Sequence, residues 1–253
     1  MKAMIFAAGL GSRLKPFTLN HPKALVSVGG KPMLQRVIEN ISSAGVTEIV
    51  VNVHHFADQI IDFLKRNNNF GLDIKISDES DCLLDTGGGL LKAKELLIAG
   101  NPDDAILLHN ADILTDVPLS EIFKAHCQNN SDITLLCSHR KSSRTLYFES
   151  TSSRLVGWES LATGETKPAG FVKEVCLDSS PFGGVHIIKK SVLERLEEWN
   201  KGGATPFSII PFYLENLNTL NIRRFLLSPK YYWFDVGSAE KLAVAEEYIN
   251  SVS

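Results

Sequence analysis

An apolar run at residues 3–8 leads directly into a glycine turn that carries two cations. The run is long enough for a central β-strand and too short to span a membrane. Gly9 and Gly11 let the backbone bend sharply and bring several N–H groups close to an anion. Arg13 adds a planar guanidinium fork, and Lys23 adds a compact positive charge. The segment therefore predicts a nucleotide-phosphate site at the carboxyl end of a strand.

Other interpretations of this turn are open, because two glycines around one residue form a weak motif. The segment could be an ordinary strand-to-loop turn with two solvated cations. A Walker loop is disfavoured, because no Gly-x-x-x-x-Gly-Lys-Ser/Thr run occurs in the chain. A dinucleotide fingerprint is also disfavoured, because Leu14 stands where its third glycine would be.

Strand-like and helix-like segments alternate along most of the chain. This order predicts a Rossmann-like, doubly wound α/β fold with a mostly parallel sheet, helices on both faces, and ligands at the carboxyl ends of the strands. Strands are expected at residues 3–8, 48–53, 73–77, 105–109, 133–138, 184–188 and 222–227. Helices are expected at residues 33–44, 57–66, 89–97, 120–128, 191–199, 207–216 and 239–248.

Residues 141–181 break this rhythm and have the pattern of β-hairpins. Two short strands are expected at residues 146–149 and 155–158, with a polar loop at residues 163–170. We interpret the segment as a small sugar-facing lobe within a single domain that spans residues 1–253.

Composition excludes several classes of function. The 26 Lys and Arg residues against 29 Asp and Glu residues give a net charge of −3, which argues against nucleic acid as a partner. The four cysteines lack the spacing of a zinc site or a disulfide framework and are expected to be buried thiols. No signal peptide and no apolar run of transmembrane length is visible, so we expect a cytoplasmic protein without a membrane partner.

Four ordered blocks of the sequence resemble the sugar-1-phosphate nucleotidyltransferases. The first runs from Ala7 to Thr18 and continues through Pro-Lys-Ala-Leu at residues 22–25 and Gly-Lys-Pro at residues 30–32. Ser12 and Ala24 depart mildly from the usual Thr and Pro of the family. The other blocks are Asp-Thr-Gly-Gly-Gly (85–89), Asn-Ala-Asp-Ile-Leu (110–114) and Trp-Phe-Asp-Val-Gly-Ser (233–238). The resemblance therefore covers essentially the whole chain.

The resemblance implies the fold of nucleotide-diphospho-sugar transferases, also called GT-A-like, and a metal-assisted reaction. Asp112 and Asp235 would hold Mg²⁺, which one or two carboxylates suit when phosphates supply further ligands. Arg13 and Lys23 would complete the catalytic set by binding the phosphates. The alternative for either aspartate is a turn residue, and for Lys23 a solvated loop lysine. Ala111 stands where the family normally has Gly, which leaves the backbone at Asp112 open.

The resemblance also implies two sets of binding residues. For the segment around Thr86, the alternative interpretation is a tight helix start with a side-chain cap. For residues 182–184, the alternative is a glycine-softened start of a strand. The nucleotide is expected to contact Ala8, Gly9, Gly11, Ser12, Arg13, Lys23, Glu79, Thr86 and Gly87. The sugar is expected to contact Asn110, Phe182, Gly183 and Gly184.

The resemblance implies a nucleoside triphosphate and a sugar 1-phosphate as substrates, and we expect a monomer or small homo-oligomer. The Glu-Lys-Pro motif of many members is absent, and Lys167 or Lys173 could replace its lysine. In this respect the chain resembles the short N-acetylmuramate-1-phosphate uridylyltransferases of peptidoglycan (cell-wall) recycling. The alternatives are a mannose- or glucose-1-phosphate nucleotidyltransferase using GTP, UTP or dTTP, a phosphocholine cytidylyltransferase, and a non-catalytic nucleotide-sugar sensor or regulatory subunit.

Overall fold

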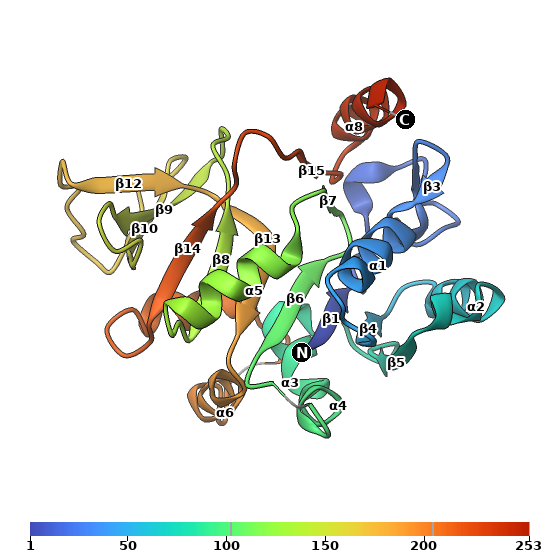
Figure 1. The fold of residues 1–253 in the computed structure, drawn as a ribbon, viewed down its shortest axis with the longest axis horizontal. Coiled ribbons are helices and arrows are strands. Elements are labelled where there is room, and N and C mark those ends of the chain that lie inside the picture. Colours follow the sequence, from blue (N-terminus) through green and yellow to red (C-terminus); the bar gives the residue numbers. More distant parts are fainter. Residues whose placement is uncertain (102, 204, 253) are drawn as a thin grey trace.

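The centre of the molecule is a seven-stranded sheet in a computed structural model that describes residues 1–101, 103–203 and 205–252. Its strands are β1 (Lys2–Phe6), β4 (Glu48–Val53), β5 (Asp73–Asp78), β6 (Ile106–Asn110), β8 (Ile133–Cys137), β13 (Phe182–Ile188) and β14 (Ile222–Leu226). They lie in the order β14-β8-β13-β6-β1-β4-β5 (Figure 1). β13 runs antiparallel to both neighbours, and the other neighbouring pairs are parallel. The predicted mostly parallel sheet is confirmed.

The first strand shows why the sheet is covered on both faces. Ala3, Met4 and Ile5 are fully buried. Ala3 and Ile5 pack in one apolar cluster and Met4 in another, because successive side chains of a strand point to opposite faces. The first cluster includes α1 (Met33–Ser43), α2 (Ala57–Arg66) and α5 (Leu119–Gln128). The second includes α3 (Asp85–Lys92), α4 (Lys94–Ile98), α6 (Lys190–Trp199) and α7 (Ile209–Glu215).

The prediction of one helix over residues 89–97 is wrong at its start. The structure has α3 from Asp85 and a separate α4, so the glycine run at residues 87–89 lies inside a helix. The N–H of Gly87 donates to the carbonyl oxygen of Phe207 at 2.9 Å. A Cβ atom at Gly87 would lie 2.2 Å from Cε2 of the same phenylalanine. Close packing against Phe207 therefore overrides the low helix propensity of glycine.

Gly87→Ala is expected to destabilise the protein by about 1–3 kcal/mol, because the added methyl group overlaps the Phe207 ring. The gain in helix propensity is about 1 kcal/mol and does not compensate for this overlap. Urea unfolding followed by circular dichroism measures the change. Gly9→Ala is the matched control, because nothing lies within 4 Å of the Cβ position there. Equal stability of the two variants would contradict the prediction.

The predicted lobe contains a four-stranded antiparallel sheet, which we call the small sheet. Its strands are β9 (Arg144–Glu149), β10 (Leu155–Ser160), β11 (Thr166–Lys167) and β12 (Leu177–Ser180), in the order β11-β10-β9-β12. The two predicted short strands fall within β9 and β10, whereas the predicted polar loop contains β11. The small sheet lies beyond β8 and β14, at one end of the central sheet (Figure 1).

Two short ribbons and the last helix meet in a third apolar cluster. β7 (Ile113–Thr115) pairs antiparallel with β15 (Trp233–Asp235), and β2 (Ser27–Val28) pairs with β3 (Lys31–Pro32). The helix α8 (Ala239–Val252) buries Leu242 and Ala245 in a cluster that includes Val28 and Val236. The pairing of β7 with β15 brings a segment near the carboxyl terminus beside the residues that follow β6.

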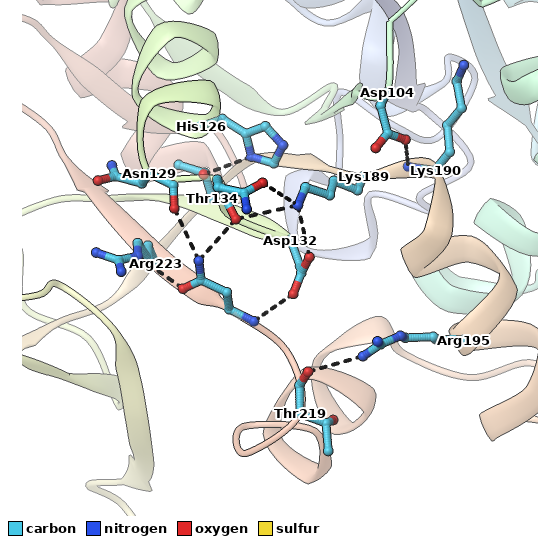
Figure 2. Close-up of polar contacts among 12 residues, drawn as sticks. Asp104, His126, Asn129, Asp132, Thr134, Lys189, Lys190, Arg195, Thr219 and Arg223 are labelled. Atoms are coloured by element: carbon cyan, nitrogen blue, oxygen red, sulfur yellow. Dashed lines mark hydrogen bonds and ion pairs between the residues drawn. The ribbon is translucent and has the colours of Figure 1, made fainter.

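A polar network joins the amino ends of β8 and β14, away from the glycine turn (Figure 2). The carboxylate of Asp132 accepts a hydrogen bond from the backbone N–H of Asn221 at 2.8 Å. It also forms an ion pair with Lys189 at 3.2 Å. The amide oxygen of Asn221 accepts from Nε of Arg223 at 3.0 Å. The contacts fix the register of these strands and carry no substrate chemistry.

Two further expectations can be compared with the structure. Cys137 is a buried thiol as expected, but Cys82, Cys127 and Cys176 are exposed, so the expectation is wrong for three of the four cysteines. They lie in loops or on a helix surface, where burial is not needed for packing. Across residues 1–101, 103–203 and 205–252, no helix has both the length and the apolar character needed to cross a bilayer.

Candidate active site

A cavity of about 370 Å³ opens at the carboxyl ends of β1 and β6. It lies where ligands are expected in a doubly wound sheet. Six separate segments of the sequence contribute to its lining. Those residues are Phe6, Ala7, Ala8, Gly9, Lys23, Ala24, Asn52, Glu79, Leu83, Asp85, Thr86, Asn110, Ala111, Asp112 and Pro206.

The glycine turn is folded back onto the segment that carries Lys23. Gly11 has a φ of +65°, and a Cβ atom there would lie 2.9 Å from the side chains of both Lys23 and Thr18. The hydroxyl of Thr18 donates to the carbonyl oxygen of Gly11 at 2.8 Å. Glycine is therefore required at position 11 for both its backbone angle and its close contacts. The turn places Lys23 at the cavity, while Ser12 and Arg13 are exposed beside it.

One wall of the cavity is a chain of hydrogen bonds that ends on a buried carboxylate. The N–H of Ala7 donates to Oδ1 of Asn52 at 2.7 Å, and Nδ2 of Asn52 donates to Oε1 of Glu79 at 2.7 Å. The N–H of Leu84 donates to Oε2 of Glu79 at 3.1 Å. Glu79 is fully buried, and such a group needs these partners. The wall is thus fixed before any ligand binds.

Asn52 lines the cavity, and the sequence analysis missed it. It stands in β4 between apolar residues that are buried. A single amide side chain inside a run of aliphatic residues was the available signal, because buried polar groups are retained where they have partners.

Asp112 and Asp235 lie side by side although they are far apart in the sequence. Asp235 is the last residue of β15 and pairs with Ile113, the residue after Asp112. The N–H of Val236 donates to the carbonyl oxygen of Asp112 at 2.8 Å. Asp112 forms an ion pair with Lys23, and Asp235 forms one with Lys241 at 2.5 Å. The backbone pairing therefore sets the Asp235–Lys241 ion pair next to the Asp112–Lys23 ion pair of the cavity, although Asp235 and Lys241 do not line the cavity themselves.

This pair of carboxylates fits a hard divalent cation. No group of three or more His, Cys, Asp or Glu side chains with metal-binding geometry occurs within the part of the chain that the structure describes. Three protein ligands are not needed where one or two carboxylates combine with substrate phosphates and water. Gly237 leaves room for the second carboxylate, because a Cβ atom there would lie 2.7 Å from Oδ1 of Asp235. Ala111 has no positive φ, so its methyl group is compatible with the turn.

Arg13 approaches the same edge from the glycine turn. Its Nη2 atom would lie 3.3 Å from a Cβ atom built on Gly237. Gly237 is two residues after Asp235 in the chain. Arg13 is exposed and does not line the cavity itself. The guanidinium is thus placed over the mouth of the site, on the side where Asp235 lies.

Thr86 and Gly87 differ in their relation to the cavity. Thr86 lines it, and its hydroxyl accepts a hydrogen bond from the N–H of Ile209 at 3.0 Å. Gly87 does not line it, and the N–H of Gly87 is bound to Phe207. Thr86 is therefore the residue of this predicted pair that lines the cavity.

The residues predicted to contact the sugar form a path away from this cavity. Asn110 lines it, and a Cβ atom at Gly184, where φ is +76°, would lie 3.0 Å from Nδ2 of Asn110. Gly183 accepts a hydrogen bond from Nε1 of Trp233 at 2.8 Å. Phe182 lines a second cavity of about 460 Å³ between the small sheet and α7. Of the four residues predicted to contact the sugar, Asn110 thus lines the first cavity and Phe182 the second, while Gly183 and Gly184 line neither.

Burial decides the protonation of the histidine beside this path. His109 precedes Asn110, and its ring nitrogen Nδ1 lies 2.9 Å from the carbonyl oxygen of Asn110. Desolvation lowers the pKa of His109 to about 4, although the field of Asp112 favours the charged form. The ring is neutral at pH 7 and adds no positive charge near the carboxylates.

Comparison with known proteins identifies the family. The family model described as nucleotidyl transferase matches residues 2–152. The chain belongs to the nucleotidyl transferase family. The N-acetylmuramate alpha-1-phosphate uridylyltransferase of Caulobacter vibrioides is 30% identical over 254 residues, which cover 96% of this chain and 95% of that protein. The family predicted from the four sequence blocks is confirmed.

Other relatives are longer than this chain. A rice protein (Oryza sativa subsp. japonica) named "Probable mannose-1-phosphate guanylyltransferase 3" is 29% identical over 94% of this chain, and the match spans 61% of the rice protein. Among solved structures, a Bacillus anthracis protein provisionally designated a glucose-1-phosphate thymidylyltransferase superposes with a TM-score of 0.80. It is 17% identical, and the match covers 100% of this chain and 96% of that one, so the likeness concerns the fold.

Proposed function

We propose that the protein is a sugar-1-phosphate nucleotidyltransferase, with UTP and N-acetylmuramate 1-phosphate as the favoured substrates. The observation that carries the proposal is the Lys23–Asp112 ion pair in the lining of a cavity of about 370 Å³, with the strand that ends at Asp235 paired to the residues that follow Asp112. The Caulobacter relative, which matches this chain over nearly its whole length, supports the choice of substrates. With that acceptor, the protein would act in cytoplasmic recycling of cell-wall peptidoglycan.

In the proposed reaction, an oxygen of the acceptor phosphate attacks the α-phosphorus of the nucleoside triphosphate. The bond from the α-phosphorus to the oxygen that bridges to the β-phosphate breaks, and pyrophosphate leaves. The nucleophile is already anionic, so neither a general base nor a covalent enzyme intermediate is needed. Catalysis then depends on alignment of the substrates and on stabilisation of charge.

Each charged residue has a place in this scheme. Lys23 neutralises the α-phosphate and the incoming phosphate, and Arg13 holds the departing β- and γ-phosphates at the mouth of the site. Asp112 and Asp235 would hold Mg²⁺ once the substrate phosphates draw Lys23 and Lys241 away from them. When bound, the ion neutralises phosphate charge and orients the phosphate oxygens.

The wall of the cavity serves the base and ribose in this proposal. Ala8, Gly9 and Thr86 line the cavity at small side chains or exposed backbone, which permits close approach of a planar base. Asn52 adds an amide whose Nδ2 group has a second hydrogen beyond the one bound to Glu79. That hydrogen suits a carbonyl oxygen on the base, which both uracil and guanine possess.

A second candidate within the enzyme class is a mannose-1-phosphate guanylyltransferase. It is favoured by the rice protein, which matches 94% of this chain. The chain spans about three fifths of the length of that relative, and it lacks the Glu-Lys-Pro motif that the sequence analysis expected of many members of the family. We therefore rank it second.

Pyrophosphate release tests the proposal. Four ribonucleoside triphosphates and dTTP are combined in turn with the 1-phosphates of N-acetylmuramate, N-acetylglucosamine, glucose and mannose, each with Mg²⁺. We expect kcat/KM to be highest for UTP with N-acetylmuramate 1-phosphate, by at least about tenfold over every other pair. A tenfold ratio corresponds to about 1.4 kcal/mol, which one hydrogen bond to a charged group of the substrate can supply. Preference for GTP with mannose 1-phosphate would favour the second candidate. No pyrophosphate release with any pair would favour a non-catalytic sensor.

A further inference from the structure

The second cavity carries a surplus of positive charge. It lies between the small sheet and α7 and is lined by three basic residues, Arg140, Arg144 and Lys167, but by one acidic residue, Glu165. Trp158 and Phe182 supply apolar and aromatic surface. Residues 182–184 link the linings of the two cavities along the chain, since Phe182 lines this one and Gly184 packs against Asn110, which lines the first.

Arg140 is the basic residue on the side of the carboxylates. It follows β8 and lines the second cavity, and it also lines a third cavity, of about 290 Å³, together with Asp235 and Lys241. Burial lowers the pKa of Arg140, and the negative charge of Asp235 opposes that shift. The guanidinium of Arg140 is thus close enough to the carboxylate of Asp235 to interact with its charge.

The guanidinium of Arg140 is held in place by two contacts, but not all of its N–H groups have hydrogen-bond partners in the described part of the chain. Its carbon atom Cζ lies 4.5 Å from the centre of the Trp233 ring, and its Nη2 atom donates to the carbonyl oxygen of Phe182 at 2.9 Å. Trp233 in turn donates to Gly183. The buried Nε of Arg140 has no hydrogen-bond partner among the residues that the structure describes. A buried donor without a partner calls for an unseen acceptor.

The two lysines left open by the sequence are less well placed. Lys173 forms an ion pair with Glu159 at 2.7 Å on the small sheet and lines neither of the first two cavities. Lys167 lines the second cavity, but it also lines a neighbouring cavity of about 880 Å³ whose lining includes neither Arg140 nor Phe182. Neither has the contact with residues 182–184 that Arg140 has.

We propose that Arg140 binds the phosphate of the acceptor sugar and takes the place of the lysine missing from the absent Glu-Lys-Pro motif. The inference rests on the proposed function for the identity of the ligand. A guanidinium suits the task because its planar fork can donate two hydrogen bonds to one phosphate. Stacking on Trp233 fixes the plane of that fork before the ligand arrives, which reduces the entropy lost on binding.

Equilibrium binding tests the inference without relying on turnover. Isothermal titration compares N-acetylmuramate 1-phosphate, glucose 1-phosphate and mannose 1-phosphate with the corresponding free sugars, for the full-length protein and for Arg140→Gln. We expect the preference of the wild-type protein for the phosphorylated sugars to fall by about 100-fold in the variant, the size expected for a charge-assisted contact. Arg140→Lys should recover part of it, because lysine restores charge without the fork.

Arg66→Gln is the matched control, because Arg66 is an exposed arginine of α2 and lines neither of the first two cavities. It should change the preference by less than about threefold, the range typical of an exposed charge. Circular dichroism and thermal unfolding check that each variant folds. In steady-state assays, Arg140→Gln should raise the KM for the acceptor while the KM for the nucleoside triphosphate stays within about twofold.

The outcomes separate the two proposals. Unchanged preference for phosphorylated sugars in a folded Arg140→Gln protein overturns the role of Arg140, whatever the turnover. Loss of that preference in a wild-type protein that binds sugar phosphates but releases no pyrophosphate supports Arg140 and overturns the proposed reaction. A wild-type protein that binds none of the three sugar phosphates overturns both.

Discussion

Asp112→Asn is expected to lower the rate of pyrophosphate release by about 1000-fold while the protein remains folded. The carboxylate faces Lys23 at the cavity and lies beside Asp235, so it is placed to hold the cation that the phosphates need. Asparagine has nearly the same size but no charge, and removal of one preorganised electrostatic contact to a transition state costs about 10²–10³ in kcat. The measurement is initial rate at saturating substrate and Mg²⁺, with circular dichroism as the test of folding.

Asp81→Asn is the matched control for this prediction. Asp81 is exposed in the loop after Glu79 and does not line the cavity. Its variant should retain the wild-type rate within about twofold, as expected for a surface charge. If Asp112→Asn kept more than a tenth of the wild-type rate, the assigned role of Asp112 would be wrong. A wild-type rate of zero would instead point to the sensor interpretation.

The sequence could predict the parts of the site that follow directly from a strand. The apolar run ending at Ala8 and the run ending before Asn110 each mark a buried strand, and β1 and β6 are neighbours in the sheet. Residues that follow neighbouring parallel strands meet at one edge. For this reason Gly9, Asn110 and Asp112 line one cavity, as the sequence analysis expected of a ligand site.

The parts that depend on distant pairing could not be predicted from local patterns. β7 and β15 have three residues each, too few to show a periodicity, yet their pairing is what sets Asp235 beside Asp112. The placement of Asp235 came from resemblance to a family. Likewise, Asn52 and Glu79 meet only because β4 and β5 are neighbours, and no spacing in the sequence encodes that contact.

Arg140 shows the same limit in another form. It lies in a segment without regular structure after β8, where a basic residue is ordinarily a solvated surface charge. What distinguishes it is the ring of Trp233, which reaches it through β15, and the carbonyl group of Phe182 on β13. Three segments from different parts of the chain must assemble before its environment exists.

Mild acid is expected to destabilise the protein through its buried histidines. Burial lowers the pKa of His109 and His126 to about 4, and burial together with the field of His109 lowers the pKa of His186 to about 3. In the unfolded chain each imidazole titrates near 6.5, so the unfolded state binds more protons between pH 6.5 and about 4. The free energy of unfolding therefore falls as the pH falls through this window, by roughly 1–2 kcal/mol per histidine at pH 5.

His186 offers the sharpest test, because both of its ring nitrogens are buried and have no hydrogen-bond partner within the described parts of the chain. Its ring packs between Phe182 and Tyr213, with centroid distances of 5.2 Å and 5.8 Å. Leucine is apolar and does not titrate, so His186→Leu should lose less stability than the wild-type protein between pH 7.5 and pH 5.0. Urea unfolding at the two pH values measures the difference.

The exposed His55 provides the control, because His55→Leu should keep the wild-type pH dependence. An unchanged pH dependence in a folded His186→Leu protein would show that His186 takes up protons equally in the native and unfolded states, and the acid sensitivity would then have to come from His109 and His126.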